Sequence, residues 1–210
     1  METQAAIRTR RSIRDFDPGR KVSDRQLHEL FELVGLSPSS YNLQAWEFLV
    51  IRAAAGKKKL RACAEDQRHV EEASAAIIVL ADTYPIDYAR TTMADRVKLG
   101  YYDQQKAQAT LAKITAWKGK GAEYRKLKAV RSVSLACMAL MLAARDMGLD
   151  SCPIEGFDSG QVRKGFGIPG RYEIAMLICL GYRKQEPRQR LPRKEVKDIV
   201  HLEALGRPLQ

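Results

Sequence analysis

Apolar and polar residues alternate with the period of an amphipathic helix near the start of this chain. From Asp24 to Gly35, apolar side chains recur three and four positions apart, which places them on one helical face. Ser23 precedes this segment and Gln26 follows three residues later, which is the spacing of a capping box. The pattern predicts a helix whose apolar stripe contains Leu27, Leu30, Phe31 and Val34.

The longest predicted helix runs from about Tyr124 to Met147, with Gly148 placed to end it. Its apolar face is so broad that we expect burial at the centre of the domain or at a subunit interface. Shorter helices are predicted at Lys57–Cys63 and from Asp158 onward. The broad face contains Leu127, Val130, Leu135, Met138, Met141 and Leu142.

Three short apolar segments predict β-strands: Glu47–Ile51, Ala75–Ala81 and Glu173–Tyr182. The central one is rich in Ile and Val and reads as a buried strand. The region Tyr84–Gly121 is polar and mixed, and we expect it to be helical in parts. Helices outnumber the scattered strands, so we predict an α+β fold. A length of 210 residues favours one domain over residues 1–210.

Composition narrows the class of protein. A hydrophobic fraction of 45% is too high for a disordered chain. The longest uninterrupted apolar stretches are far shorter than the ~20 residues that a membrane-spanning helix needs, so we expect no membrane. The formal charge of +11, from 36 basic and 25 acidic residues, implies an anionic partner. It does not distinguish nucleic acid, a membrane surface and a phosphorylated ligand.

The cysteines and histidines indicate neither a disulfide framework nor a metal site. No C-x-x-C pair occurs, so the four cysteines are predicted to be reduced, buried thiols of a cytoplasmic protein. The first residues lack the apolar core of a secretory signal. No carboxylate or thiol stands at metal-ligand spacing around a histidine. These residues are Cys63, Cys137, Cys152, Cys179, His28, His69 and His201.

Neither a G-x-G-x-x-G nor a Walker phosphate loop is present, and no G-x-S-x-G elbow occurs. An enzyme without a nucleophile or metal of its own usually relies on a cofactor. Two basic clusters at opposite ends of the chain, Arg10–Arg14 and Arg188–Arg190, have the chemistry to bind phosphate. On composition alone, each is more typical of a solvated surface segment.

Two further segments have an unusual composition. Ser37–Asn42 combines hydroxyls, an amide and a proline between a predicted helix and a strand. Pro153–Asp158 contains Gly156, which lets the backbone approach a flat ligand closely. Taken singly, they could be an ordinary loop and a turn that leads to a helix cap.

Taken together and in order, these four segments resemble the FMN-dependent nitroreductases. The family's R-x-S-x-R pattern begins at Arg10. The pattern S-P-S-S-x-N-x-Q-x-W-x-F spans Ser37–Phe48, with Ala45 where the family usually has Pro. P-I-E-G-F-D occupies Pro153–Asp158, and a late basic-x-R-L-P motif spans Arg188–Pro192.

This resemblance implies a nitroreductase-like fold, with a central mixed antiparallel sheet flanked by helices. It also implies a domain-swapped-type homodimer with two FMN molecules at the interface. The implied activity passes electrons from NAD(P)H to nitroaromatics, quinones or similar small acceptors by a ping-pong mechanism. No side chain needs to act as an acid or base, because the flavin N5 carries the hydride. Neither nucleic acid nor a metal is expected as a partner.

The resemblance also assigns roles to particular residues. Arg14 takes the position of a cation near the flavin N1 and C2 oxygen, where it stabilises the anionic reduced flavin. The backbone at Pro153–Gly156 lies over the isoalloxazine ring, and the Pro38–Asn42 loop reaches the flavin from the partner subunit. Asp66 and His69 stand where the family often has Asn or Lys. The implied FMN contacts are Arg10, Arg11, Ser12, Arg14, Pro38, Ser39, Ser40, Asn42, Gln67, Pro153, Ile154, Glu155, Gly156, Arg188 and Arg190.

Two other functions remain open at this point. One is a flavoenzyme of the same fold with different chemistry, such as reductive dehalogenation or dehydrogenation. A substrate lid within Tyr84–Gly121 would separate it from a nitroreductase. The other is a non-enzymatic anion-binding protein, which the charge of +11 would suit.

Overall fold

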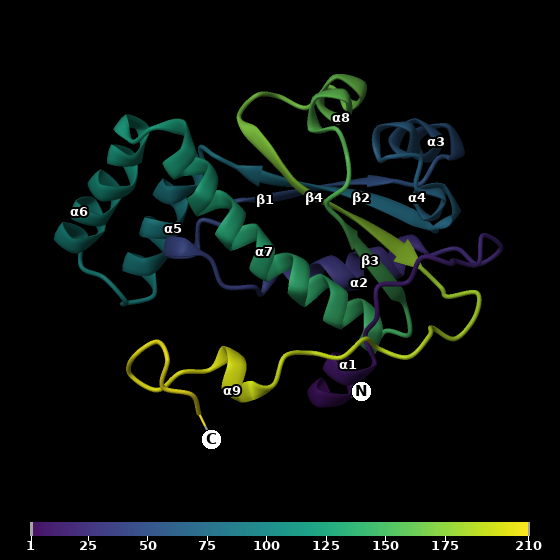
Figure 1. Cartoon of the computed structure of the whole chain (residues 1–210). Coiled ribbons are helices and arrows are strands. Elements are labelled where there is room, and N and C mark those ends of the chain that lie inside the picture. The colour runs from purple at the N-terminus through teal and green to yellow at the C-terminus, as the bar shows by residue number, and fades with distance from the viewer. Residues whose placement is uncertain (1, 210) are drawn as a thin grey trace.

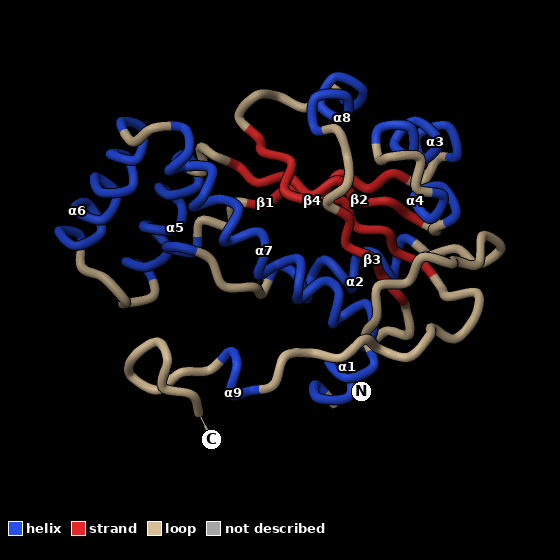
Figure 2. The backbone as a smooth tube through the Cα atoms, viewed as in Figure 1, coloured by secondary structure: helices blue, strands red, loops and turns tan. Residues whose placement is uncertain are grey.

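The centre of the fold is a four-stranded antiparallel sheet in the order β1-β2-β4-β3 (Figure 2). The computed structural model describes residues 2–209. Parallel pairing occurs at an isolated bridge, where Ser12 pairs with Ser151 at the sheet edge. The strands are β1 Trp46–Ile51, β2 Ala75–Asp82, β3 Asp150–Ile154 and β4 Tyr172–Gly181.

Helices cover both faces of the sheet (Figure 1). α2 and α7 pack on one face, and α3, α4 and α8 pack on the other. α5, α6 and η2 form a separate hydrophobic cluster with Leu43. The helices are α1 Thr3–Thr9, α2 Asp24–Gly35, α3 Ala54–Cys63, α4 Arg68–Glu72, α5 Ile86–Lys98, α6 Gln104–Thr115, α7 Ala122–Asp146, α8 Ser159–Phe166 and α9 Val196–Ile199, with 3-10 turns η1 Ser40–Asn42 and η2 Ala116–Gly119.

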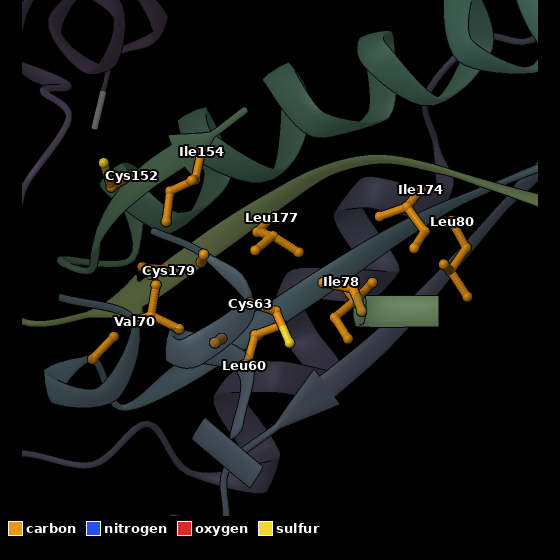
Figure 3. Close-up of a cluster of buried hydrophobic side chains, with 14 of the residues drawn as sticks. Leu60, Cys63, Val70, Ile78, Leu80, Cys152, Ile154, Ile174, Leu177 and Cys179 are labelled. Atoms are coloured by element: carbon orange, nitrogen blue, oxygen red, sulfur yellow. The ribbon is translucent and has the colours of Figure 1, made fainter. Parts of the chain in front are cut away.

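β2 is buried along its whole length because both of its faces are covered. Ile77 and Val79 join the core under α2 and α7, whereas Ile78 and Leu80 join the core under α3 and α8. This division follows from the two-residue period of a strand. Figure 3 shows the second core, where Leu60 of α3 and Leu177 of β4 lie around Ile78. The predicted α+β class is confirmed.

The helix predicted at Asp24–Gly35 has the same bounds in the structure. Ser23 Oγ accepts a hydrogen bond from the backbone N–H of Gln26, and the Gln26 side chain accepts one from the N–H of Ser23, which completes the capping box. The long helix is α7, and Gly148 follows it in the left-handed region at φ 74°. The four cysteines are free and buried, as predicted.

The short helices α1, α4 and α9, the strand β3 and the 3-10 turns η1 and η2 were not predicted. β3 contains Pro153, which made its segment read as a turn. The strand tolerates this proline because it lies at the sheet edge, where a missing backbone N–H leaves no ladder bond broken on the outer side.

α7 is the one helix among residues 2–209 that is long and apolar enough to cross a membrane, with a mean hydropathy of 1.6 over its most apolar window. Length and composition alone do not identify a membrane span, because the core helix of a globular domain has the same properties. Here Val133, Cys137 and Leu140 of α7 are buried in the core shared with the sheet and α2.

Candidate functional site

The two basic segments from opposite ends of the chain lie side by side. The Arg190 side chain donates hydrogen bonds to the backbone carbonyls of Arg8 and Arg10, at 3.1 Å and 2.5 Å. Arg11 donates in return to the carbonyl of Gln189 at 3.3 Å. Figure 1 shows the C-terminal segment, in yellow, passing the N-terminal helix α1. The fold therefore gathers Arg10, Arg11 and Arg190 into one cationic cluster.

The buried carboxylate of Asp150 helps to hold the N-terminal and C-terminal segments together. Asp150, at the start of β3, is 4% exposed and accepts hydrogen bonds from Arg183 Nη2 at 2.7 Å and Nε at 2.8 Å. Asp150 also pairs with Arg145 at 3.4 Å, and Arg145 donates to the hydroxyl of Thr9 at 3.2 Å. One carboxylate thus connects the end of α7, the N-terminal segment and the start of the C-terminal segment.

The backbone reinforces the same connection. The N–H of Ile13 donates to the carbonyl of Ser151 at 3.1 Å, next to the bridge between Ser12 and Ser151. Farther along, the N–H of Lys184 donates to the carbonyl of Asp15 at 3.0 Å. The Arg10–Arg14 segment is therefore held against the edge strand β3.

The cationic cluster lacks neutralising carboxylates. Within residues 2–209, none of Arg10, Arg14 and Arg190 forms an ion pair with an acidic side chain. Burial lowers the pKa of Arg10, and the charges of Arg190 and Arg193 lower it further. Arg10 Nη1 is buried without a hydrogen-bond partner in the described chain. Because burying such a donor unpaired is costly, this cluster is suited to an anionic ligand.

Arg14 extends the cluster toward α4. It lies beside the thiol of Cys152, where its hydrogen bond partly offsets the burial that raises the pKa of that thiol. Arg14 also lowers the pKa of His69, although burial contributes more to that shift. His69 is 6% exposed, and its Nε2 has no hydrogen-bond partner in the described residues. One buried polar atom without a partner in the described residues, His69 Nε2, therefore lies near Arg14.

Gly156 lies just after β3 and contacts Gln67, the residue before α4. Gln67 donates a hydrogen bond from Nε2 to the carbonyl of Gly156 at 2.9 Å. A Cβ at position 156 would lie 2.8 Å from a carboxylate oxygen of Glu65, so the backbone is closely approached there. Glu65 and Asp66, which lead to Gln67, adopt the left-handed conformation at φ 50° and 53°. Such strain in residues other than glycine is concentrated at functional sites.

The remaining predicted FMN contacts lie in the C-terminal segment and at the end of β3. Arg188 is exposed and precedes Arg190 in the same segment, and Pro153, Ile154 and Glu155 lead to Gly156 from β3. The structure thus joins Arg10, Arg11, Ser12 and Arg190 beside the edge strand β3. Pro153 and Ile154 lie in β3 itself, and Gln67 and Gly156 contact each other beyond its end.

The Pro38–Asn42 loop does not join this group. The Tyr41 ring packs against Trp117 with centroids 5.9 Å apart and planes tilted by 54°, and Trp117 contacts Tyr124 at the start of α7. The cationic cluster instead contacts the other end of α7 through Arg145. From Tyr124 to Arg145 an α-helix rises about 30 Å. The loop and the cluster therefore cannot contact one small ligand within a single chain.

The loop has its own strained geometry. Tyr41, Asn42 and Gln44 have φ of 54°, 59° and 47°. The hydroxyl of Ser39 accepts a hydrogen bond from the N–H of Gln44 at 2.9 Å and so holds this turn closed. Several unusual backbone conformations in sequence indicate a loop whose shape serves a contact.

Several residues of the site were not predicted from the sequence. Asp150, Arg145 and Arg183 have no distinguishing local pattern, because their pairing depends on contacts between distant segments. Glu65 was missed for the same reason. Among residues 2–209, no group of three or more His, Cys, Asp and Glu side chains is arranged to hold a metal ion.

The architecture and this site define an α+β protein with a cationic cluster at the edge of its sheet. The sequence model of the nitroreductase family matches residues 7–182, so the chain belongs to the nitroreductase family. It is 32% identical to a Bacillus subtilis protein named "Putative NAD(P)H nitroreductase MhqN", over 92% of this chain and 95% of that one. It is 37% identical to another, "Putative NAD(P)H nitroreductase YdgI", over 83% and 85% of the two chains.

Solved structures agree with this membership. A Bacillus subtilis protein named "putative nitroreductase ydfN" superposes with a TM-score of 0.89 at 31% identity, covering 95% of this chain and 97% of that one. An Exiguobacterium sibiricum protein named "putative nitroreductase", solved in complex with FMN, superposes with a TM-score of 0.87 at 30% identity, covering 97% of this chain and 98% of that one.

Proposed function

We propose that this protein is an FMN-dependent oxidoreductase that passes electrons from NAD(P)H to nitroaromatics, quinones or similar small acceptors. Family membership and the FMN-containing relative from Exiguobacterium sibiricum support this proposal. The single observation that carries it is the cationic cluster of Arg10, Arg11 and Arg190, extended by Arg14, whose guanidinium groups have no carboxylate partner in the described chain. FMN fits this cluster because it has a dianionic phosphate at one end and a polar ring edge at the other.

At the phosphate end, Arg10, Arg188 and Arg190 supply charge-assisted hydrogen bonds, with Arg11 and Ser12 beside them. The unpartnered Nη1 of Arg10 gains an acceptor there. Burial lowers the pKa of Arg10, and repulsion from Arg190 lowers it further; FMN binding would relieve this repulsion.

At the ring end, Arg14 and Gln67 orient the pyrimidine edge, and the backbone at Pro153–Gly156 lies against the ring. Gly156 suits this position because its backbone can approach a flat ligand without a side chain. The bound FMN supplies hydride transfer at its ring, so the protein's part is to bind, orient and tune it. NAD(P)H and the acceptor use the same site in turn, which gives a ping-pong mechanism.

We propose that a second copy of the chain completes the site. Pro38, Ser39, Ser40 and Asn42 lie about a helix length away from the cationic cluster of their own chain, so they would reach the FMN of the partner. The outer face of α7 is apolar and available for such pairing, since Leu127 is 49% exposed and Leu135 is 52% exposed. A homodimer would cover this face and create two equivalent sites.

Within this proposal, residues 1–210 form one domain that works in the cytoplasm. The four free, buried cysteines suit a reducing compartment.

The test is to purify the protein and to measure FMN content and NAD(P)H-dependent reduction of a quinone. We expect about one FMN per chain and steady turnover. Arg10→Gln should lose FMN, whereas Arg25→Gln, a matched loss of charge on the exposed face of α2, should retain it. Protein without flavin that still binds inorganic phosphate would favour the anion-binding alternative. Protein with flavin that reduces neither quinones nor nitroaromatics would favour the alternative flavoenzyme chemistry.

A further inference from the structure

His69 is a buried titratable group to which the proposed FMN contacts assign no part. It lies on the short helix α4, is 6% exposed and forms no ion pair within residues 2–209. Its Nε2 is shielded from solvent and has no hydrogen-bond partner in the described chain. Because most buried polar atoms are paired, this nitrogen calls for a physical explanation.

The N-terminal segment brings a cation close to this histidine. The N–H of Ile13 donates to the carbonyl of Ser151 at 3.1 Å, which holds the segment against β3. Ile13 and Val70, the residue after His69, belong to the same buried core. Arg14 follows Ile13 and lies close enough for its charge to act on the imidazole of His69. The cation assigned to the flavin ring and the unpartnered histidine are therefore neighbours.

Two charged side chains act most strongly on His69. Burial is the main reason that its pKa lies below the ordinary value of 6.5, Arg14 lowers the pKa further, and Glu72 raises it. Glu72 lies three residues later on α4, where Arg68 pairs with it at 2.8 Å and so weakens its effect. The local field therefore disfavours a positive charge on the imidazole.

The other elements around α4 carry titratable groups that are engaged or neutral. From α3, the buried Lys57 donates a hydrogen bond to the carbonyl of Ala73, at the end of α4. From β3, Cys152 lies beside Arg14, and burial raises the pKa of its thiol, which is therefore uncharged at pH 7. Arg14 thus remains the main unpaired charge near His69.

This environment makes the charge of His69 sensitive to what Arg14 binds. At pH 7 the imidazole is neutral, so one ring nitrogen carries a proton and the other can accept one. A proton that binds at Nε2 breaks no hydrogen bond, because that nitrogen has no partner in the described chain. Burial and the charge of Arg14 oppose protonation. A negative charge held by Arg14 would offset the second of these and favour the protonated ring.

We propose that His69 takes up a proton from solvent when FMN held by Arg14 is reduced, and releases it when the FMN is reoxidised. NAD(P)H delivers a hydride, which is two electrons and one proton, and leaves one added negative charge beside Arg14. His69 balances this charge with a second proton. A quinone needs two electrons and two protons to become a hydroquinone, and the reduced site holds both. This inference rests on the proposed function, which places Arg14 at the flavin ring.

The proton affinity of His69 is measured by NMR from the titration of its ring Cε1–H signal, which is assigned by its loss in His69→Gln. The FMN-loaded protein is titrated when oxidised and again after reduction with dithionite in the absence of oxygen. We expect the reduced protein to bind this proton about tenfold more tightly, the lower end of the effect of one nearby opposite charge. His28, exposed on α2 beside Glu32, should titrate alike in both states.

The midpoint potential of the bound FMN gives an independent readout. Each proton taken up with two electrons lowers this potential by about 30 mV for a tenfold fall in proton concentration. Between the two pKa values of His69, the wild type should therefore show a slope of about 60 mV per pH unit and His69→Gln about 30 mV. His28→Gln should keep the wild-type slope. A slope of two protons that survives in His69→Gln would place the second proton elsewhere and overturn the proposal.

The contribution of Arg14 is tested in the ligand-free protein, where FMN binding plays no part. Arg14→Gln should raise the pKa of His69 in the NMR titration, whereas Arg25→Gln on α2 should leave it unchanged. A wild-type pKa in Arg14→Gln would contradict the proposed coupling. If FMN binds and is reduced but the proton affinity of His69 stays the same, this inference is wrong and the proposed function stands. If the protein binds no FMN, both are wrong.

Discussion

Arg190 is the residue that joins the two ends of the chain at the proposed phosphate site. Its side chain reaches the carbonyls of Arg8 and Arg10, so its charge stands beside another guanidinium. Burial lowers the pKa of Arg10, and this unfavourable proximity to Arg190 lowers it further. A dianionic phosphate converts the same proximity into a favourable interaction.

We predict that Arg190→Gln lowers FMN affinity by about one to two orders of magnitude, because a charge-assisted contact contributes roughly 1.5–3 kcal/mol. Riboflavin, which lacks the phosphate, should bind the variant and the wild type alike. Lys184→Gln removes one charge from the same segment and serves as the control. Titration of both flavins at fixed salt checks this, and an equal loss for both would place Arg190 away from the phosphate.

His69 carries a prediction about pH. Burial and, to a smaller extent, Arg14 lower its pKa below the ordinary value of 6.5, whereas Glu72 opposes the shift. The unfolded chain therefore binds a proton at this residue more readily than the folded chain. The contribution of neutral His69 to the free energy of unfolding is complete above the pKa that the residue has in the unfolded chain. This contribution is lost as the pH falls through about 6.5 and below.

We expect His69→Gln to reduce the loss of unfolding free energy between about pH 7.5 and about pH 5. Denaturant titrations of the wild type and the variant at both pH values measure the difference. His28→Gln, which alters an exposed histidine on α2, should keep the wild-type pH dependence. A His69→Gln profile parallel to that of the wild type would show that His69 does not titrate in this way.

At the scale of elements, helices and strands that depend on local interactions were predicted from the sequence, whereas those that depend on long-range pairing were missed. α2 was predicted to its end residues because the capping box of Ser23 and Gln26 is local. β2 was predicted because its apolar run is continuous and buried. β3 was missed because its strand character comes from pairing with β4 rather than from its own residues. Local signals therefore set most of the fold, and long-range pairing set the rest.

The candidate site shows the same division. The resemblance named Arg10, Arg14, Gly156 and Arg190. The structure places Arg190 against the backbone of Arg10 and Gly156 against Gln67, and the contacts of these residues with FMN stay a prediction. Their arrangement depends on Asp150, which has no local signature because its partners come from distant parts of the chain.

Asp150 gives the prediction that belongs to this scale. Asp150→Asn leaves Arg145 and Arg183 without their buried partner, which should lower the free energy of unfolding by about 3 kcal/mol. The N-terminal and C-terminal cations then lose their common anchor, so FMN affinity should fall more than riboflavin affinity. Asp95→Asn on the exposed side of α5 should leave stability and both affinities unchanged.

Chemical denaturation and paired flavin titrations of the same protein separate the two effects of Asp150→Asn. A purely structural role would lower both flavin affinities by the same factor. That result would remove Asp150 from the account of phosphate binding and leave it as a support of the fold.

At the scale of the whole molecule, α7 determines what one chain can do alone. Its 25 residues place the Pro38–Asn42 loop and the cationic cluster near opposite ends. Its outer face keeps Leu127 and Leu135 exposed. The proposed two-fold dimer accounts for both features, because in it each FMN would meet the cations of one chain and the loop of the other.

The central claim is that a single chain does not contain a complete site, and mixed dimers test it most directly. One variant, Arg10→Glu with Arg14→Glu, removes the cationic half, and a second variant, Ser40→Glu with Asn42→Glu, removes the loop half. Each homodimer should bind little FMN and should not reduce a quinone with NAD(P)H. After equal mixing, subunit exchange should restore up to about a quarter of the wild-type sites, because one of the two sites in each mixed dimer combines two intact halves. If mass spectrometry shows exchange and neither FMN binding nor activity returns, each FMN belongs to a single chain and the account is wrong.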